Sequence, residues 1–239
     1  GWTGCLTGVP PLGPNPDPYD LCIMDYEYIQ YPNEKTGIKA KTEIYHTWAH
    51  EYFHSYQRRY VLDREMTVGP YAYPTWWVEG AATIFPDLWL RNNWEKFSAF
   101  AGFNFDEIAV GGMKVNEMFK FQRRMIMGEL SPEEENEMPE ENFYLGTKDE
   151  SYDTFNHCCA NTANAYLAYL TSYETAFISI PKDAYELGFE GSFIKHVGMT
   201  PQEFYDIHNT FMRQGDPNDD PPEGFYPEGD IKEYIDFWE

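Results

Sequence analysis

The stretch KTEIYHTWAHEYFHSYQRRY, residues 41–60, decides how the rest of the chain is interpreted. It contains no Gly or Pro, and the large apolar side chains Ile44, Trp48 and Tyr52 recur every four residues. This spacing is close to the period of an α-helix and predicts a helix over the whole stretch. Inside it lies His50-Glu51-Tyr52-Phe53-His54, the pattern H-E-x-x-H, whose two histidines fall on one helical face.

The two imidazoles of this pattern predict a zinc site, and a third ligand is expected from a second helix over residues 75–91. That helix begins TWWVEGAATIF, which is too apolar for an exposed surface, and Pro86 is expected to kink or interrupt it. Because an unpaired buried carboxylate is costly, Glu79 needs a compensating charge among these apolar neighbours. A metal ion supplies it, so His50, His54 and Glu79 are the expected zinc ligands.

This ligand set also indicates what the metal is for. Two neutral imidazoles and one carboxylate leave the fourth position of a tetrahedral zinc ion open, as in catalytic rather than structural sites. Glu51 is then expected to act as general base, taking a proton from a water activated by the metal and passing it to the leaving amine. The pattern therefore predicts zinc-dependent hydrolysis of peptide bonds.

A family resemblance extends this interpretation. H-E-x-x-H at residues 50–54 followed by WVEGA at residues 77–81 resembles the signature of the gluzincin zinc metallopeptidases. The segments HEYFHSYQ (50–57) and GSFIKHVGMTPQEFYDIHNTFM (191–212) are more similar to their collagenase-like and aminopeptidase-like branches than to thermolysin. Over residues 40–213 the resemblance implies an α+β, mostly helical catalytic domain. It would have a small N-terminal sheet subdomain, about residues 1–60, and a helical subdomain, about residues 61–214, around a zinc cleft.

The resemblance further implies a Tyr or His that stabilises the oxyanion from across the cleft. His157-Cys158-Cys159-Ala160, with Tyr166-Leu167 further on, is similar to the family segment that carries this donor. An imidazole can donate the required hydrogen bond, so His157 is the candidate. Tyr152 is the competing donor, and a histidine bonded to backbone at a helix start is the structural alternative.

Two residues near the expected ligands keep alternative interpretations. His46 lies one turn before His50. A packed or solvent-facing histidine is the default interpretation, and a partner of the ligands or an alternative ligand are the others. Thr83 lies one turn after Glu79, where some gluzincins place an acid that orients a zinc histidine. The sequence therefore does not decide which side chains orient the expected ligands.

The remaining elements are mostly helical. Helices are expected over residues 112–127, 154–172, 183–197 and 201–213, the last opened by a capping box of Thr200 and Glu203 with Pro201 between them. The best strand candidate is 19–30, and 131–142 is an acidic, proline-broken loop. Residues 215–229, rich in Pro, Asp and Gly, predict a linker or surface wrap, followed by a tail to residue 239.

The sequence DPNDD, residues 216–220, begins like a calcium-binding loop. However, Pro221 stands where that loop requires Gly, and Pro227 stands where it requires Glu. A solvated acidic turn is therefore the default interpretation, and bound Ca²⁺ is the alternative.

Amino-acid composition limits the classes of partner that we expect for this protein. With 17 Lys plus Arg against 40 Asp plus Glu, the net charge of -23 repels phosphate backbones and excludes nucleic acid as an expected partner. No apolar run approaches the length of a membrane span. Cys5 and Cys22 bracket a loop that a disulfide can close. We expect a secreted, cell-surface or periplasmic protein, although solvation alone is the default explanation of an acidic surface.

The expected substrate is a polypeptide, cleaved at internal bonds, because no convincing motif for anchoring a free amino terminus is present. An aminopeptidase of the same superfamily is one alternative. A zinc-bearing binding module without turnover is the other, and the intact Glu51 argues against it. The sequence carries no signal for an oligomeric state or for the substrate side chains that are preferred.

Overall fold

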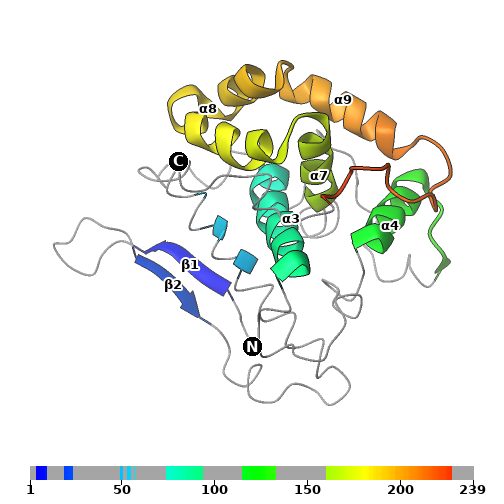
Figure 1. Ribbon diagram of the computed structural model, residues 1–239, viewed down its shortest axis with the longest axis horizontal. Coiled ribbons are helices and arrows are strands. Elements are labelled where there is room, and N and C mark those ends of the chain that lie inside the picture. The colour runs from blue at the N-terminus through cyan, green and yellow to red at the C-terminus, as the bar shows by residue number, and fades with distance from the viewer. Residues whose placement is uncertain are drawn as a thin grey trace, which may run out of the picture.

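The computed structural model describes residues 4–9, 19–23, 49–50, 53–54, 57, 74–93, 115–132 and 160–227. This part of the chain is mostly helical (Figure 1). The helices are α3 (Thr75–Asn93), α4 (Val115–Met127), α7 (Ala160–Leu170), α8 (Ile180–Val197) and α9 (Pro201–Met212), with a π-helical turn, η6 (Thr175–Ser179), directly before α8. No described helix has the length and apolar character needed to cross a membrane.

Two short strands, β1 (Gly4–Val9) and β2 (Tyr19–Ile23), pair antiparallel near the N-terminus. β2 covers the start of the stretch expected as a strand, and residues 24–30 lie outside the described part. The pairing sets Cys5 opposite Cys22, and opposed residues of such a ladder lie within the Cα separation that a disulfide needs. The disulfide and the larger sheet subdomain implied by the resemblance both stay predictions.

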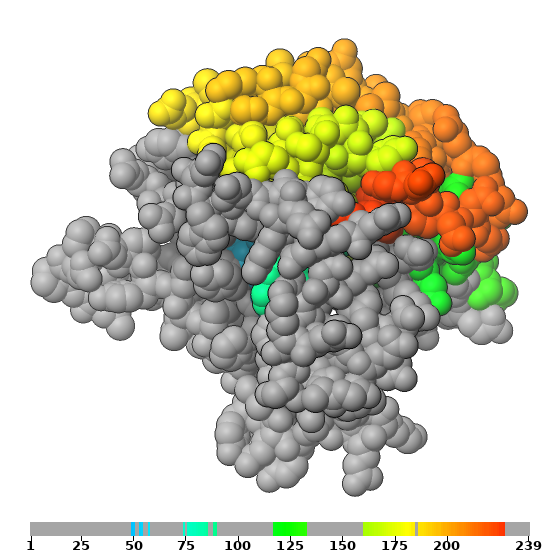
Figure 2. Space-filling model, in the orientation of Figure 1, coloured from blue at the N-terminus to red at the C-terminus, as the bar shows by residue number. Residues whose placement is uncertain are grey.

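The core is built around the contact between α3 and α7. Trp76, Trp77 and Ile84 on one side and Ala163 and Leu167 on the other are almost completely buried. α8 and α9 lie over the top of this pair in Figure 1 and form a continuous face with residues 213–227 in Figure 2. Contacts between aromatic rings join α3 and α7 to the helices above them.

Between α3 and α9, a ring contact is combined with a hydrogen bond. The Trp76 ring stacks on Phe204 at a centroid distance of 5.4 Å, and its indole nitrogen donates to the Tyr205 hydroxyl at 3.1 Å. Such a pair adds to the area that each ring buries, and the hydrogen bond satisfies the indole donor. The apolar half of the segment 75–85 is therefore core, as the sequence predicts.

Of the kink or interruption expected at Pro86, the interruption is wrong, since α3 continues to Asn93, two residues past the expected end of this helix. A kink at Pro86 stays a prediction. A proline inside a helix removes a backbone hydrogen bond and costs about 3 kcal/mol or more. Ile84 and Leu88, which flank it, are both fully buried, and burying each contributes about 1.5–3 kcal/mol. Packing on both sides of the proline therefore outweighs the lost bond.

The helix expected over residues 183–197 begins earlier and is irregular. Its first residue, Ile180, follows the π-turn, in which the Ile180 N–H bonds to the carbonyl of Thr175. At Gly188 the backbone leaves helical geometry with φ of 70° and ψ of 167°, so α8 is two helical pieces joined by a bend. Only glycine adopts this conformation without strain.

The N-terminus of α9 is confirmed in detail. The Thr200 side chain accepts from the Glu203 N–H, and the Glu203 carboxylate accepts from the Thr200 N–H, which completes the capping box. Pro201 occupies the first helical position. The helix ends at Met212, one residue before the expected end.

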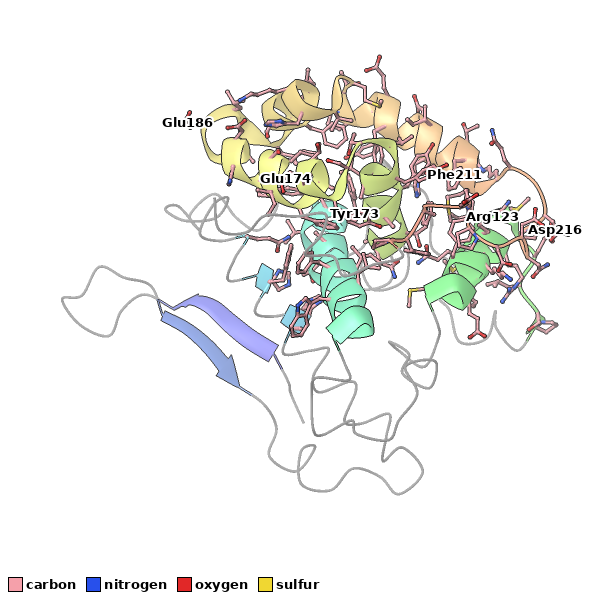
Figure 3. All side chains as sticks on the ribbon, in the orientation of Figure 1. Arg123, Tyr173, Glu174, Glu186, Phe211 and Asp216 are labelled. Carbon is pink, nitrogen blue, oxygen red and sulfur yellow. The ribbon has the colours of Figure 1, made fainter. Side chains whose placement is uncertain are left out.

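Residues 213–227 are a surface wrap rather than a free linker. Phe225 is completely buried and contacts Phe119 of α4 and Phe211 of α9 at 5.1 and 5.8 Å between ring centroids. Arg123, also buried, donates to the carbonyls of Met212 and Gln214 at the end of α9. Figure 3 shows Arg123 on α4 facing the turn that carries Asp216. Residues 213–227 therefore belong to the helical body, by which we mean α3, α4, α7, α8 and α9 together with this segment.

Candidate metal centre

The site lies where the helical residues His50 and His54 meet Glu79 in the first turns of α3. The two histidines are one turn apart, and their rings meet edge to face with centroids 4.6 Å apart. Glu79 reaches them from α3. The side chains of His50, His54 and Glu79 are only 12, 13 and 19% exposed, so the cluster is largely shielded from water.

Three potential ligand atoms converge at this point. The Nε2 atoms of His50 and His54 are 3.0 Å apart, and they lie 3.3 and 3.4 Å from Oε2 of Glu79. Zinc binds imidazole nitrogen and carboxylate oxygen at about 2.0–2.2 Å, which makes the edge of a tetrahedral site about 3.3 Å. The three atoms thus have the mutual spacing of three corners of a zinc tetrahedron.

The charge of Glu79 depends on these histidines. Burial alone raises the pKa of the Glu79 carboxyl, but hydrogen bonds and charge interactions with His50 and His54 outweigh burial and bring that pKa well below its usual range. The carboxylate is therefore ionised, and it needs positive charge beside it. Protonated imidazoles would supply that charge without a metal, and a divalent cation would supply it while the imidazoles stay neutral.

Each histidine has an oxygen behind its other ring nitrogen. Nδ1 of His54 is 2.8 Å from Oε1 of Gln57, and Nδ1 of His50 is 3.4 Å from Oγ1 of Thr83. Thr83 also donates to the Glu79 carbonyl at 2.9 Å. An acceptor at Nδ1 keeps the proton there and directs the Nε2 lone pair outward, which is how proteins orient histidines that bind metals.

Gly80 explains why a glycine follows the glutamate in WVEGA. A Cβ placed on Gly80 would lie 2.2 Å from the carbonyl oxygen of Ala160, the first residue of α7. Backbone therefore packs directly on backbone at this crossing. Phe53 stacks on Phe85 of α3 at 4.9 Å between ring centroids and meets Phe177 of η6 edge to face. These contacts anchor the helical residues that include His50, His54 and Gln57, called the histidine helix below, to α3 and η6.

The structure thus brings together His50, His54 and Glu79, the three expected ligands. Glu51, His157, Tyr152 and His46 lie outside the described residues, and their roles stay predictions. Sequence reasoning missed Gln57. The signal available for it was its position three residues after His54, on the same helical face.

The acidic turn predicted as an alternative calcium site is organised by its own contacts. The carboxylates of Asp216 and Asp219 accept backbone N–H groups within the turn, and Asp220 pairs with Lys120 at 2.7 Å. These contacts favour the solvated acidic turn, and calcium binding remains a prediction without added support.

Within the described ranges, His50, His54 and Glu79 form the group of His, Cys, Asp or Glu side chains whose donor atoms are close enough to hold one metal ion. The donor chemistry and the spacing both fit zinc. Comparison with known proteins found no match among protein-family models, curated proteins or solved structures.

Proposed function

We propose that this chain is a zinc-dependent peptidase of the gluzincin type, with His50, His54 and Glu79 as the metal ligands. The observation that carries the proposal is the convergence of two imidazole nitrogens and one carboxylate oxygen at 3.0–3.4 Å from one another. A bound zinc ion would polarise the scissile carbonyl and lower the pKa of a water beside it.

The general base and the oxyanion donor in this proposal are side chains of the protein. Glu51, next to His50 in the sequence, takes the proton of the attacking water and delivers it to the leaving amine. His157 donates a hydrogen bond to the oxyanion that develops on the carbonyl, with Tyr152 as the competing donor. His157 precedes Ala160 by three residues, and Ala160 starts α7 against Gly80, beside the ligand Glu79, which supports this choice.

The substrate in this proposal is a polypeptide, and cleavage at internal bonds is favoured over removal of amino-terminal residues. The resemblance of residues 40–213 to gluzincins supports a cleft between a sheet subdomain and the helical body. The acidic composition supports a location outside the cytoplasm, because secreted proteins of this charge stay soluble in salt.

The test pairs zinc analysis with peptide hydrolysis for the wild type and Glu51→Gln. We expect Glu51→Gln to keep its zinc and to lose activity by about 10²-fold or more, because the base is removed while the ligands stay. Full activity in Glu51→Gln would refute the mechanism. Matched peptides with free and acetylated amino termini then separate the cleavage modes, since an aminopeptidase cleaves only the free ones.

A further inference from the structure

Gln57 contacts both halves of the candidate metal centre. Its side chain is buried, with 2% of its surface exposed. At one end of the amide, Oε1 lies 2.8 Å from Nδ1 of His54. At the other end, Nε2 donates to the carbonyl oxygen of Val78 at 2.9 Å. One amide therefore connects a ligand on the histidine helix to the backbone of α3 directly before Glu79.

The chemistry of these partners determines the direction of both hydrogen bonds. A backbone carbonyl only accepts, so the Gln57 amide must present its NH₂ group to Val78. Its oxygen then faces His54, and a carbonyl oxygen can only accept, so Nδ1 of His54 carries the proton. In a neutral imidazole this leaves the lone pair on Nε2, the atom that lies 3.4 Å from Oε2 of Glu79.

We infer that Gln57 is a positioning residue for the metal centre: it holds His54 in its metal-binding tautomer and keeps the histidine helix in register with Glu79. This inference rests on the proposed zinc site. Because Gln57 is buried, water does not compete for either bond. Thr83 makes a longer contact of 3.4 Å with His50, so Gln57 provides the firmer of the two supports.

The two roles of Gln57 can be separated by two substitutions. Gln57→Met keeps the approximate length of the side chain but removes both the acceptor and the donor. Gln57→Glu removes the donor to Val78 and keeps an acceptor for His54, since a carboxylate behind a zinc-bound histidine is a common arrangement. Both variants lose the bond to Val78, and Gln57→Glu also sets a carboxylate oxygen beside that carbonyl, so a purely structural role predicts that Gln57→Glu is weakened at least as much as Gln57→Met.

A third variant controls for the loss of any buried glutamine. Gln122 on α4 is also fully buried, and its Nε2 donates to Oδ1 of Asn161 on α7 at 2.8 Å. Gln122→Met therefore breaks a bond between helices without changing a contact to His50, His54 or Glu79. The zinc affinity of Gln122→Met therefore shows how far a general loss of contacts between helices weakens metal binding.

The experiment measures the zinc dissociation constant of the full chain by competition with a chelator, and the absorption spectrum of the Co²⁺-substituted protein. We expect Gln57→Met to weaken zinc binding by about 10–100-fold and to change the Co²⁺ spectrum. Gln57→Glu should restore zinc affinity to near the wild-type value, and Gln122→Met should leave it unchanged. Unfolding of the metal-free variants in urea verifies that each one folds.

Three results would overturn the inference. Wild-type affinity in Gln57→Met shows that His54 needs no such support. Weakening in Gln57→Glu that equals or exceeds that in Gln57→Met shows that the contribution is structural. If the wild-type chain itself binds no zinc, the metal centre fails and the role of Gln57 fails with it, which is distinguishable from the first two results.

Discussion

Gly80 and Ala160 are in backbone contact, so closely that a Cβ on Gly80 would lie 2.2 Å from the Ala160 carbonyl oxygen. This contact sets the distance between α3 and α7 next to Glu79, the proposed ligand. The glycine that follows Glu79 is thus required by packing, whether or not a metal binds.

Gly80→Ala should therefore destabilise the fold by at least about 1–3 kcal/mol, the usual range for overpacking, since backbone cannot move aside as a side chain can. Urea unfolding measures the change. Gly191→Ala is the control: Gly191 is inside α8, and its added Cβ would meet only the Leu187 side chain at 3.1 Å. We expect a change of less than about 1 kcal/mol there. Equal losses would contradict the account of Gly80.

His208 should make the stability of the helical body depend on pH. Burial between Tyr166 and Phe204 lowers the pKa of His208 from 6.5 to about 4, against a small opposing effect of Asn209. The folded protein binds this proton less readily than the unfolded chain, so the contribution is complete above pH 6.5 and is lost as the pH falls toward 4. The loss is on the order of 3 kcal/mol at pH 4.

The comparison of His208→Phe with the wild type isolates this effect, because other titrating groups are common to both proteins. Urea unfolding at pH 7 and near pH 4 should show a smaller acid loss in the variant, which keeps an aromatic ring and has no proton to bind. Identical pH dependence in the two proteins would mean that His208 does not titrate as its burial requires.

Phe225 distinguishes a surface wrap from a linker. Because this ring is completely buried against Phe119 and Phe211, Phe225→Ala should cost about 3–5 kcal/mol in the free energy of unfolding. Glu223→Ala, an exposed position in the same segment, should change it by less than about 0.5 kcal/mol. A negligible effect of Phe225→Ala would indicate that residues 215–227 are not part of the folded body.

We expect Arg123 to stabilise the C-terminal end of α9. Removing its guanidinium leaves the carbonyls of Met212 and Gln214 without a charged donor, and each such loss costs about 1–3 kcal/mol. We expect Arg123→Met to lower the unfolding free energy clearly more than Arg124→Met, whose arginine makes an exposed contact with Asn218 at 3.3 Å. Equal effects would show that the buried contact adds no stability.

The sequence predicted the elements that depend on local signals. The capping box of Thr200 and Glu203 and the start of α3 at Thr75 are set by residues close in the chain, and both are confirmed. The same helix was expected to reach residue 91 with a kink or interruption at Pro86, and the absence of an interruption could not be predicted, because it depends on what Ile84 and Leu88 pack against. The burial of Phe225 depends on the same kind of distant contact.

The site was predictable to a similar extent. His50 and His54 are related by helix periodicity, and the cost of burying a charge connects Glu79 to them. Gln57 could not be assigned from the sequence, because half of its role is a bond to Val78 on another helix. Such pairings across helices follow from the fold alone.

The central claim is that His50, His54 and Glu79 hold zinc, and the most direct test is the zinc content and affinity of Glu79→Ala beside His196→Ala. His196 is the matched control because its Nε2 also lies close to a carboxylate, 2.5 Å from Asp183 on the same helix. The account predicts one zinc ion per chain in the wild type and in His196→Ala, and a large loss of affinity in Glu79→Ala. Wild-type zinc affinity in Glu79→Ala, or a wild-type chain without affinity for zinc, would contradict it.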